Sequence, residues 1–139
     1  MNVLMLLKNK DQVAYLYDTN TLRQGLEKMR AHGYSAIPVL SEDGKYMGCV
    51  SEGDFLWHML EHQSSGMKEQ ENYHVKELVR KNFNPAVKVS ISMEELLSKA
   101  MNQNFIPVVD DRKYFIGIVT RQDIIKSFMR VPQKSVVNI

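Results

Sequence analysis

Two short stretches of the sequence, GCVSEGD and GIVTRQD, present the same chemical groups in the same order. In each stretch a hydroxyl residue stands three positions before an aspartate, as Ser51 before Asp54 and Thr120 before Asp123. Strand-like apolar residues precede each hydroxyl, and the apolar spacing of a helix follows each aspartate. Because a helix N-terminus offers free N–H groups and a partial positive charge, the pattern predicts two positions where an anion can bind.

The hydroxyl–aspartate spacing has two interpretations, and the sequence leaves both open. In the structural one, Ser51 or Thr120 caps a helix and the aspartate completes a capping box. In the ligand-binding one, the hydroxyl and the free amides bind a phosphate, and the ionised aspartate accepts both hydroxyls of a ribose. Aspartate is shorter than the usual glutamate or glutamine of a capping box. A glycine also recurs before each strand end, which suggests close approach by another group. With an apolar cover for a flat base, these groups describe a nucleotide site.

The two stretches belong to a repeat with an offset of 69 residues. This offset carries IPV at 37–39 onto IPV at 106–108 and Gly48 onto Gly117. Each half is read as strand, helix, strand, strand, helix from its β-branched and aromatic runs and its i, i+4, i+7 apolar spacing. The predicted strands are 13–17, 36–40, 46–50, 86–89, 105–109 and 114–119. The predicted helices are 19–33, 54–62, 75–82, 92–103 and 123–129, with Pro132 ending the last one.

This organisation predicts an α+β fold made of two β-α-β-β-α repeats. We divide the chain into a first repeat with its N-terminal segment (1–63), a polar linker (64–73), a second repeat (74–130) and a tail (131–139). One repeat alone has too little core to be stable. The sheets of the two repeats are therefore expected to pack together about a pseudo-twofold axis.

The composition narrows the class of protein. The 139 residues are 44% apolar and 24% charged, and the net charge of +2 comes from scattered Lys and Arg, so no nucleic-acid groove is expected. No apolar run approaches the ~20 residues of a membrane span. The single cysteine, Cys49, allows no internal disulfide, which suits the cytoplasm. It alternates with apolar neighbours, so we interpret it as a core residue.

Two further features have competing interpretations. His58 and His62 are four residues apart on a predicted helix and could face one metal ion, but no third ligand accompanies them. We therefore place both on a solvated helix face and expect no metal site. Trp57 corresponds to Lys126 in the second repeat, so it lies outside the shared core pattern. It is either an exposed interface anchor or a partly buried side chain.

The tandem stretches GYSAIPVL…YMGCVSEGDFL and NQNFIPVV…FIGIVTRQDII resemble a pair of CBS domains, also called a Bateman module, from about Val13 to Met129. The resemblance implies two clefts between the repeats and regulatory binding of adenine nucleotides. It also implies pairing into disc-like dimers of four CBS units. The first repeat is similar to small stand-alone bacterial CBS proteins that bind cyclic di-AMP. This adds cyclic di-AMP to AMP, ADP and ATP as candidate ligands.

The resemblance implies roles for residues at matching positions. Ser51 and Asp54 match the phosphate-side hydroxyl and the ribose carboxylate of the first cleft, and Thr120 and Asp123 match those of the second. The residues that match base-contacting positions are Tyr34, Ala36 and Ile37 in the first repeat, and Phe105 and Ile106 in the second. Those that match the far side of the base pocket are Tyr15 and Val87.

The two clefts differ in charge. Arg121 follows Thr120 and brings a cation to the phosphate position. Glu52 follows Ser51 and would repel a phosphate. We therefore expect the cleft at Asp123 to bind a phosphorylated ligand. The other cleft is expected to bind a less charged ligand or to stay empty.

These observations lead to two functions of different classes. In the first, the chain is a regulatory ligand-sensing module that binds an adenine nucleotide, forms a homodimer and relays occupancy to an unknown effector protein. In the alternative, it is a protein–protein adaptor or dimerisation module of the same fold without a physiological nucleotide. No nucleophile, base and orienting group recur together, so we expect no enzymatic activity and no required cofactor.

Overall fold

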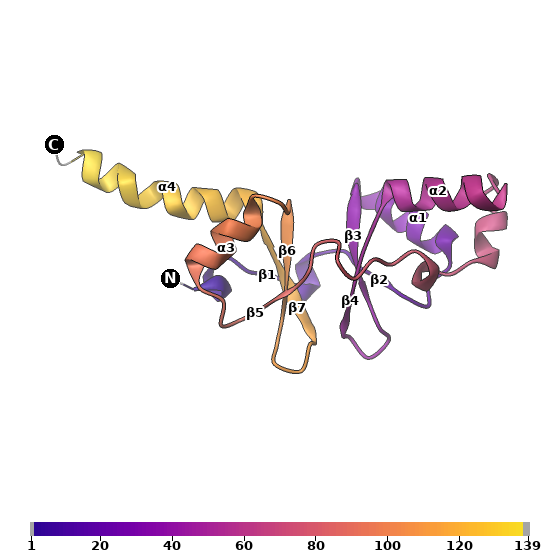
Figure 1. The fold of residues 1–139 in the computed structure, drawn as a ribbon, viewed down its shortest axis with the longest axis horizontal. Coiled ribbons are helices and arrows are strands. Elements are labelled where there is room, and N and C mark those ends of the chain that lie inside the picture. Colours follow the sequence, from indigo (N-terminus) through magenta and orange to yellow (C-terminus); the bar gives the residue numbers. More distant parts are fainter. Residues whose placement is uncertain (1, 138–139) are drawn as a thin grey trace.

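The computed structural model describes residues 2–137, with 130–137 described by their backbone alone. Two halves lie side by side, each with a small sheet and two main helices (Figure 1). The first half contains β2 (Leu16–Tyr17), α1 (Leu22–His32), β3 (Ala36–Leu40), β4 (Tyr46–Ser51) and α2 (Glu52–His62). The second contains β5 (Val87–Lys88), α3 (Met93–Ala100), β6 (Phe105–Val109), β7 (Phe115–Thr120) and α4 (Arg121–Val137). This confirms the predicted α+β fold of two β-α-β-β-α repeats.

The two sheets have the same internal topology. In the first, β2 runs parallel to β3, which pairs antiparallel with β4; in the second, β5, β6 and β7 repeat this order. Each antiparallel pair has a register irregularity at the same place, between Val39 and Leu40 and between Val108 and Val109. The repeat seen in the sequence is therefore a repeat of backbone geometry as well. Within residues 2–137, no helix combines the length and apolar character needed to cross a membrane.

Each half also contains a segment from outside its own repeat. The N-terminal strand β1 (Lys8–Asn9) pairs with β7 of the second half, and Val3, in the 3-10 helix η1 (Val3–Met5), is fully buried in the second core. In the other direction, Val75 of the 3-10 helix η4 (Val75–Glu77) is buried in the first core. The two halves are therefore interlocked, and Figure 1 shows the N-terminal segment lying against the second half.

These crossings explain the recurring glycines. A Cβ at Gly48 would lie 2.5 Å from the carbonyl oxygen of Arg80, and a Cβ at Gly117 would lie 2.1 Å from that of Lys8. Both glycines also have positive φ angles, 143° and 155°, which other residues rarely adopt. The group that approaches each glycine closely is thus the chain's own backbone.

The segment predicted as a polar linker, 64–73, has local structure of its own. It contains the 3-10 helix η3 (Glu69–Asn72), which packs on α1. The side chain of Gln70 is fully buried there, and its Nε2 donates to the carbonyls of Ser64 and Gly66 at 3.3 and 3.1 Å. The exposed guanidinium of Arg23 forms an ion pair with Glu71 at 3.2 Å.

Some predicted element bounds were wrong. The helix predicted at 75–82 is only the single turn η4, because the following backbone pairs with Cys49 of β4. The last helix does not end at Pro132, since α4 continues to Val137, so most of 131–139 is helix rather than a separate tail. Proline removes one N–H and crowds one carbonyl, which weakens a helix locally without ending it here. The last two residues of the predicted tail, 138–139, lie outside the described residues.

The strands predicted at 13–17 and 86–89 are also shorter than predicted. β2 and β5 retain two residues each. Both lie at the edge of their sheet, where one neighbour supplies the only pairing. The connecting 3-10 helix η2 (Lys10–Gln12) precedes β2.

The prediction of a solvated face for both histidines was wrong for His58, which is 6% exposed, and right for His62. Tyr73 folds back onto α2, and the rings of Tyr73, His58 and His62 form one cluster. The centre of the His58 ring lies 4.6 Å from that of Tyr73 and 3.9 Å from that of His62, and the latter two are 5.0 Å apart. Trp57 is exposed, and Cys49 is fully buried as predicted. Burial raises the pKa of the Cys49 thiol to about 11, so it remains neutral and is a poor nucleophile.

Candidate functional site

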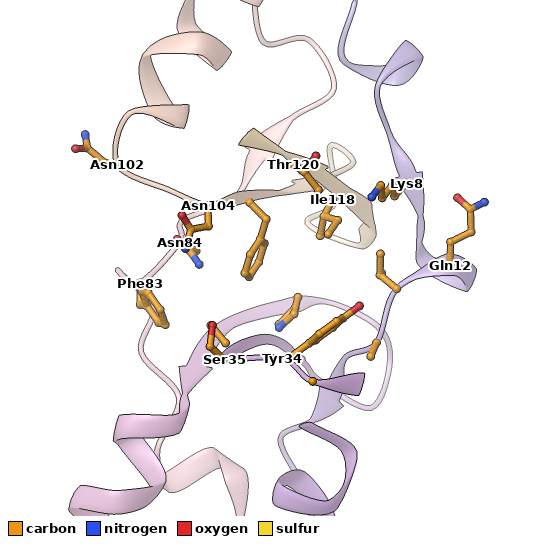
Figure 2. A pocket seen from close by; sticks show the side chains of 16 residues that line it. Lys8, Gln12, Tyr34, Ser35, Phe83, Asn84, Asn102, Asn104, Ile118 and Thr120 are labelled. Atoms are coloured by element: carbon orange, nitrogen blue, oxygen red, sulfur yellow. The ribbon is translucent and has the colours of Figure 1, made fainter. Parts of the chain in front are cut away.

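A cavity of about 500 Å³ lies between the two sheets and is lined by both halves. Figure 2 shows Tyr34 and Ser35 on one wall, facing Ile118 and Thr120 on the other. Lys8 and Gln12 of the N-terminal segment close one end of the cavity. The other end is bordered by Phe83, Asn84 and Asn104 (Figure 2). The volume lies within the ~300–1,000 Å³ range of small-molecule sites.

Strand alternation decides which predicted base-contacting residues reach this cavity. Ala36 and Pro38 line it, whereas Ile37 between them is fully buried in the first core, because successive strand side chains point to opposite faces. In β6, Phe105 lines the cavity and Ile106 is fully buried in the second core. The two isoleucines therefore pack into the cores on the faces of the strands that point away from the cavity.

Two residues predicted for the far side of the base pocket lie outside the cavity. Val87 is 5% exposed and belongs to the second core. Tyr15 lies next to Ala14, which lines the cavity, but its own ring packs edge-on against Tyr17 at 5.6 Å. The ammonium groups of Lys10 and Lys28 lie 5.4 and 5.1 Å from the centre of the Tyr15 ring.

Thr120 connects the cavity to the N-terminus of α4. Its Oγ1 accepts a hydrogen bond from the backbone N–H of Asp123 at 3.2 Å, and the backbone N–H of Arg121 donates to the carbonyl of Asn104 at 2.9 Å. Thr120 and Asn104 line both the cavity and an adjoining open hollow that also contacts Arg121 and Lys126. A phosphate beside Thr120 could therefore reach two cations.

Arg121 lies beside the cavity and is partly engaged elsewhere. Its Nε donates to the carbonyl of Ala100 at 2.6 Å, at the C-terminal end of α3. This bond holds the guanidinium at the end of α3, beside the hollow that adjoins the cavity. Among the described residues that line the cavity itself, Lys8 alone carries a charge.

Asp123 lines a smaller hollow of about 300 Å³ together with Lys8 and Lys126. Lys8 lines both this hollow and the main cavity. Within residues 2–129, no hydrogen bond or ion pair engages the Asp123 carboxylate. This carboxylate is therefore available as an acceptor beside the cavity.

Asp54, the matching residue of the first repeat, has protein partners instead. Its carboxylate accepts from the backbone N–H of Ser51 at 2.8 Å and from the Ser51 hydroxyl at 3.1 Å. The Arg80 guanidinium forms an ion pair with the same carboxylate, with Nε 3.1 Å from Oδ1 and Nη2 3.2 Å from Oδ2. Neither Ser51 nor Asp54 lines the central cavity. The bond from the Ser51 N–H to the carboxylate is the geometry that the capping interpretation expects at this junction.

The structure thus brings together Tyr34, Ala36, Phe105 and Thr120, places Arg121 and Asp123 beside them, and leaves the other predicted residues outside. Sequence reasoning missed the polar residues that complete the cavity, which are Lys8, Gln12, Ser35, Asn84, Asn102 and Asn104. Lys8 lies outside the repeat, so no internal match could identify it. Asn84 has a left-handed backbone with φ of 53°, but an asparagine in a loop gives no distinctive signal.

Comparisons with known proteins bear on the family and the fold. A family model described as CBS domain matches residues 9–61 and 75–130. A crystal structure of CbpB in complex with c-di-AMP is similar in fold, with a TM-score of 0.90 and 22% identity. The match covers 100% of this chain and 91% of that one.

Two further relatives are more similar in sequence. CbpB of Listeria monocytogenes, solved in complex with c-di-AMP, has 26% identity and a TM-score of 0.82, with 94% of this chain and 97% of that chain covered. The uncharacterized protein MJ1426 of Methanocaldococcus jannaschii is 28% identical over 82% of this chain and 84% of its own length.

Proposed function

We propose that this chain, which belongs to the CBS-domain family, is a regulatory sensor that binds an adenine nucleotide in the central cavity beside Thr120. The observation that supports this most is the joining of three chemical environments in one place. Tyr34 and Phe105 offer aromatic surface for a base, Thr120 at the N-terminus of α4 offers a hydroxyl, and Asp123, in the hollow that shares Lys8 with the cavity, offers an unengaged carboxylate.

Each part of a nucleotide has a matching group. A base can lie against the aromatic rings with little cost in hydrogen bonds, because Ser35 and Asn104 line the same walls. A phosphate can accept from the Thr120 hydroxyl and lie near Lys8, with the positive end of the α4 dipole behind it. A ribose can donate both hydroxyls to Asp123. Cyclic di-AMP is a leading candidate because the Listeria protein binds it.

Occupancy would be relayed through the outer helices. Leu56 and Leu60 on α2 are exposed, and so are the equivalent residues of the second repeat, Ile125 and Met129 on α4. Two equivalent apolar faces on one chain suit a twofold partner, so we propose a homodimer joined through these helices. A ligand can shift the dimer only by the difference in its affinity for the two shapes. Since nucleotides of this kind are made in the cytoplasm, we place the sensor there.

The test is a thermal-shift and calorimetry screen of AMP, ADP, ATP, cyclic di-AMP and S-adenosylmethionine. A ligand at about 100 times its dissociation constant should stabilise the fold by about 2.7 kcal/mol. Asp123→Ala should remove most of that stabilisation, whereas Asp111→Ala, which deletes an exposed carboxylate from the β6–β7 turn, should keep it.

Three results would count against the proposal. If no nucleotide moves the melting curve, the adaptor function is favoured, with the exposed Trp57 on α2 as its contact. If the nucleotide is consumed during the measurement, the chain is an enzyme. If Asp123→Ala binds as well as the unmodified chain, the ribose is bound elsewhere.

A further inference from the structure

We propose that Arg80 occupies the first cleft and limits the chain to nucleotide at the second. This inference rests on the proposed function and adds the residue that decides where the nucleotide binds. It starts from the ion pair between the Arg80 guanidinium and Asp54, with contacts of 3.1 and 3.2 Å. The carboxylate that would accept the ribose hydroxyls in the first cleft already accepts from this guanidinium.

The remaining contacts of Arg80 hold it in the same position. Its Nη2 lies 3.4 Å from the Ser51 hydroxyl, the group that would bind a phosphate. The guanidinium carbon lies 4.3 Å from the centre of the Phe83 ring, as in a cation–π contact. Arg80 therefore contacts both the residue predicted to bind a phosphate, Ser51, and the residue predicted to bind a ribose, Asp54, at the same time.

The backbone of Arg80 is also fixed. Its N–H donates to the carbonyl of Cys49 at 3.0 Å, and the Cys49 N–H donates to its carbonyl at 3.2 Å. Gly48 makes this crossing possible, because any side chain there would collide with the Arg80 carbonyl. These two bonds fix the backbone of Arg80 at the free edge of β4, within reach of Asp54, while the side chain itself is half exposed.

Lys8 has the equivalent place in the second cleft. Its carbonyl crosses Gly117 as that of Arg80 crosses Gly48, and its side chain lines the hollow that contains Asp123. Yet no ion pair joins Lys8 to Asp123 within the described residues. The planar guanidinium of arginine bonds a carboxylate through two nitrogens, whereas the ammonium of lysine is a mobile point charge. One difference in residue type thus separates a filled cleft from an open one.

Space for a ligand remains beside Phe83 if the guanidinium is removed. An open hollow of about 430 Å³ lies there, lined by Phe83, Asn84 and Gln103, and it shares Phe83 and Asn84 with the central cavity. Phe83 lines this hollow and also contacts the Arg80 guanidinium, so removal of the guanidinium would free both the Phe83 ring and the Asp54 carboxylate. The variant is therefore expected to gain a binding site rather than lose one.

The experiment counts bound nucleotide by calorimetry, with AMP and with cyclic di-AMP as probes. The number of molecules bound per chain should double in Arg80→Ala and return to the original value in Arg80→Ala/Asp54→Ala. Arg23→Ala is the matched control, because it removes an exposed arginine with carboxylate partners on α1 and η3, and it should change nothing. Arg80→Met keeps the apolar stem against Phe83 and replaces Arg80→Ala if that variant fails to fold.

A second measurement needs no variant. The NMR signal of the Arg80 Nε–H should stay at its position when the unmodified chain is saturated with nucleotide, because Arg80 remains on Asp54. An unchanged number of bound molecules in Arg80→Ala, or a shifted Arg80 signal on saturation, would overturn the inference while leaving the sensor function intact. Absence of binding in every variant would instead overturn the sensor function.

Discussion

Ser51-x-x-Asp54 and Thr120-x-x-Asp123 occupy the same place in the two repeats, yet their carboxylates have different partners. Asp54 is engaged by Ser51 and Arg80, whereas the Asp123 carboxylate has no hydrogen bond or ion pair within residues 2–129. Both hydroxyl residues cap their helices or accept the return bond of a cap, but only at the first junction does the carboxylate itself take part. Repetition of a sequence pattern preserves the backbone, but the side chains supplied by the crossing segments give the two copies different surroundings.

The first prediction concerns the crossings themselves, where the largest effect is expected. Gly117→Ala should destabilise the fold by about 3 kcal/mol or more, because the new Cβ meets the Lys8 carbonyl and the backbone is strained. Gly48→Ala should lower the free energy of unfolding by somewhat less, because its new Cβ would lie 2.5 Å from the Arg80 carbonyl oxygen, compared with 2.1 Å from the Lys8 oxygen at Gly117. Urea unfolding measures both values.

Gly53→Ala is the control for these variants. Gly53 lies inside α2, and a Cβ there meets only ordinary contacts at 3.7 Å and beyond. Alanine favours a helix by roughly 0.5–1 kcal/mol over glycine. If Gly117→Ala unfolds no more easily than Gly53→Ala, the Lys8 carbonyl does not approach Gly117 closely enough to exclude a side chain.

The second prediction contrasts the outer faces of α2 and α4. Trp57 on α2 corresponds to Lys126 on α4, so the face of α2 is the more apolar of the two. Leu60→Asp should weaken self-association by about 2 kcal/mol, near 30-fold, and Met129→Asp by less. Analytical ultracentrifugation gives the dissociation constants. If Met129→Asp weakens self-association as much as Leu60→Asp or more, the apolar content of the two faces does not decide their contribution to the dimer.

The third prediction concerns the loss of stability in acid, which should arise from a histidine in the first half. Burial, followed by the charge of His62, lowers the pKa of His58 below its ordinary value near 6.5. The other titratable groups that face it are Glu77, whose Oε1 lies 3.9 Å from Nε2, Glu61 and Tyr73. The corresponding residue of the second half, Ser127, does not titrate in this range and donates to the carbonyl of Ile124 at 2.7 Å.

The direction of the pH effect follows from the lowered pKa. On acidification the unfolded chain takes up the proton on this histidine before the folded chain does, so stability falls as the pH drops below about 6.5. The slope for one group cannot exceed about 1.4 kcal/mol per pH unit. Urea unfolding across this range should show the loss in the unmodified chain and a smaller one in His58→Phe. Equal losses in both chains would contradict the assignment.

Much of the fold could be predicted because the repeated residues favour particular local structures. The Gly, Pro and apolar positions fixed the order of strands and helices and the pairing of each repeat. The crossings could not be predicted, because Lys8 and Arg80 lie in short segments without periodicity and pair with a distant strand. The same lack of periodicity hid the burial of His58 under Tyr73.

The candidate site was only partly visible for a related reason. Strand alternation places Ala36 and Phe105 on the cavity and Ile37 and Ile106 in the cores, and it could have been applied to the sequence once the facing surface was known. Arg121 and Glu52 predict unequal binding at the two clefts, and this stays a prediction. The structural difference between the two aspartates lies in Arg80, which is far from either motif in the sequence and pairs with Asp54 alone of the two.

A crystal structure of the chain with AMP or cyclic di-AMP, whichever gives the larger thermal shift, tests the inequality of the two clefts most directly. We expect the nucleotide in the central cavity, with a phosphate against Thr120 and a ribose at Asp123, while Arg80 still contacts Asp54. A nucleotide bound to Asp54 with Arg80 displaced, or bound outside the cavity altogether, would contradict the account.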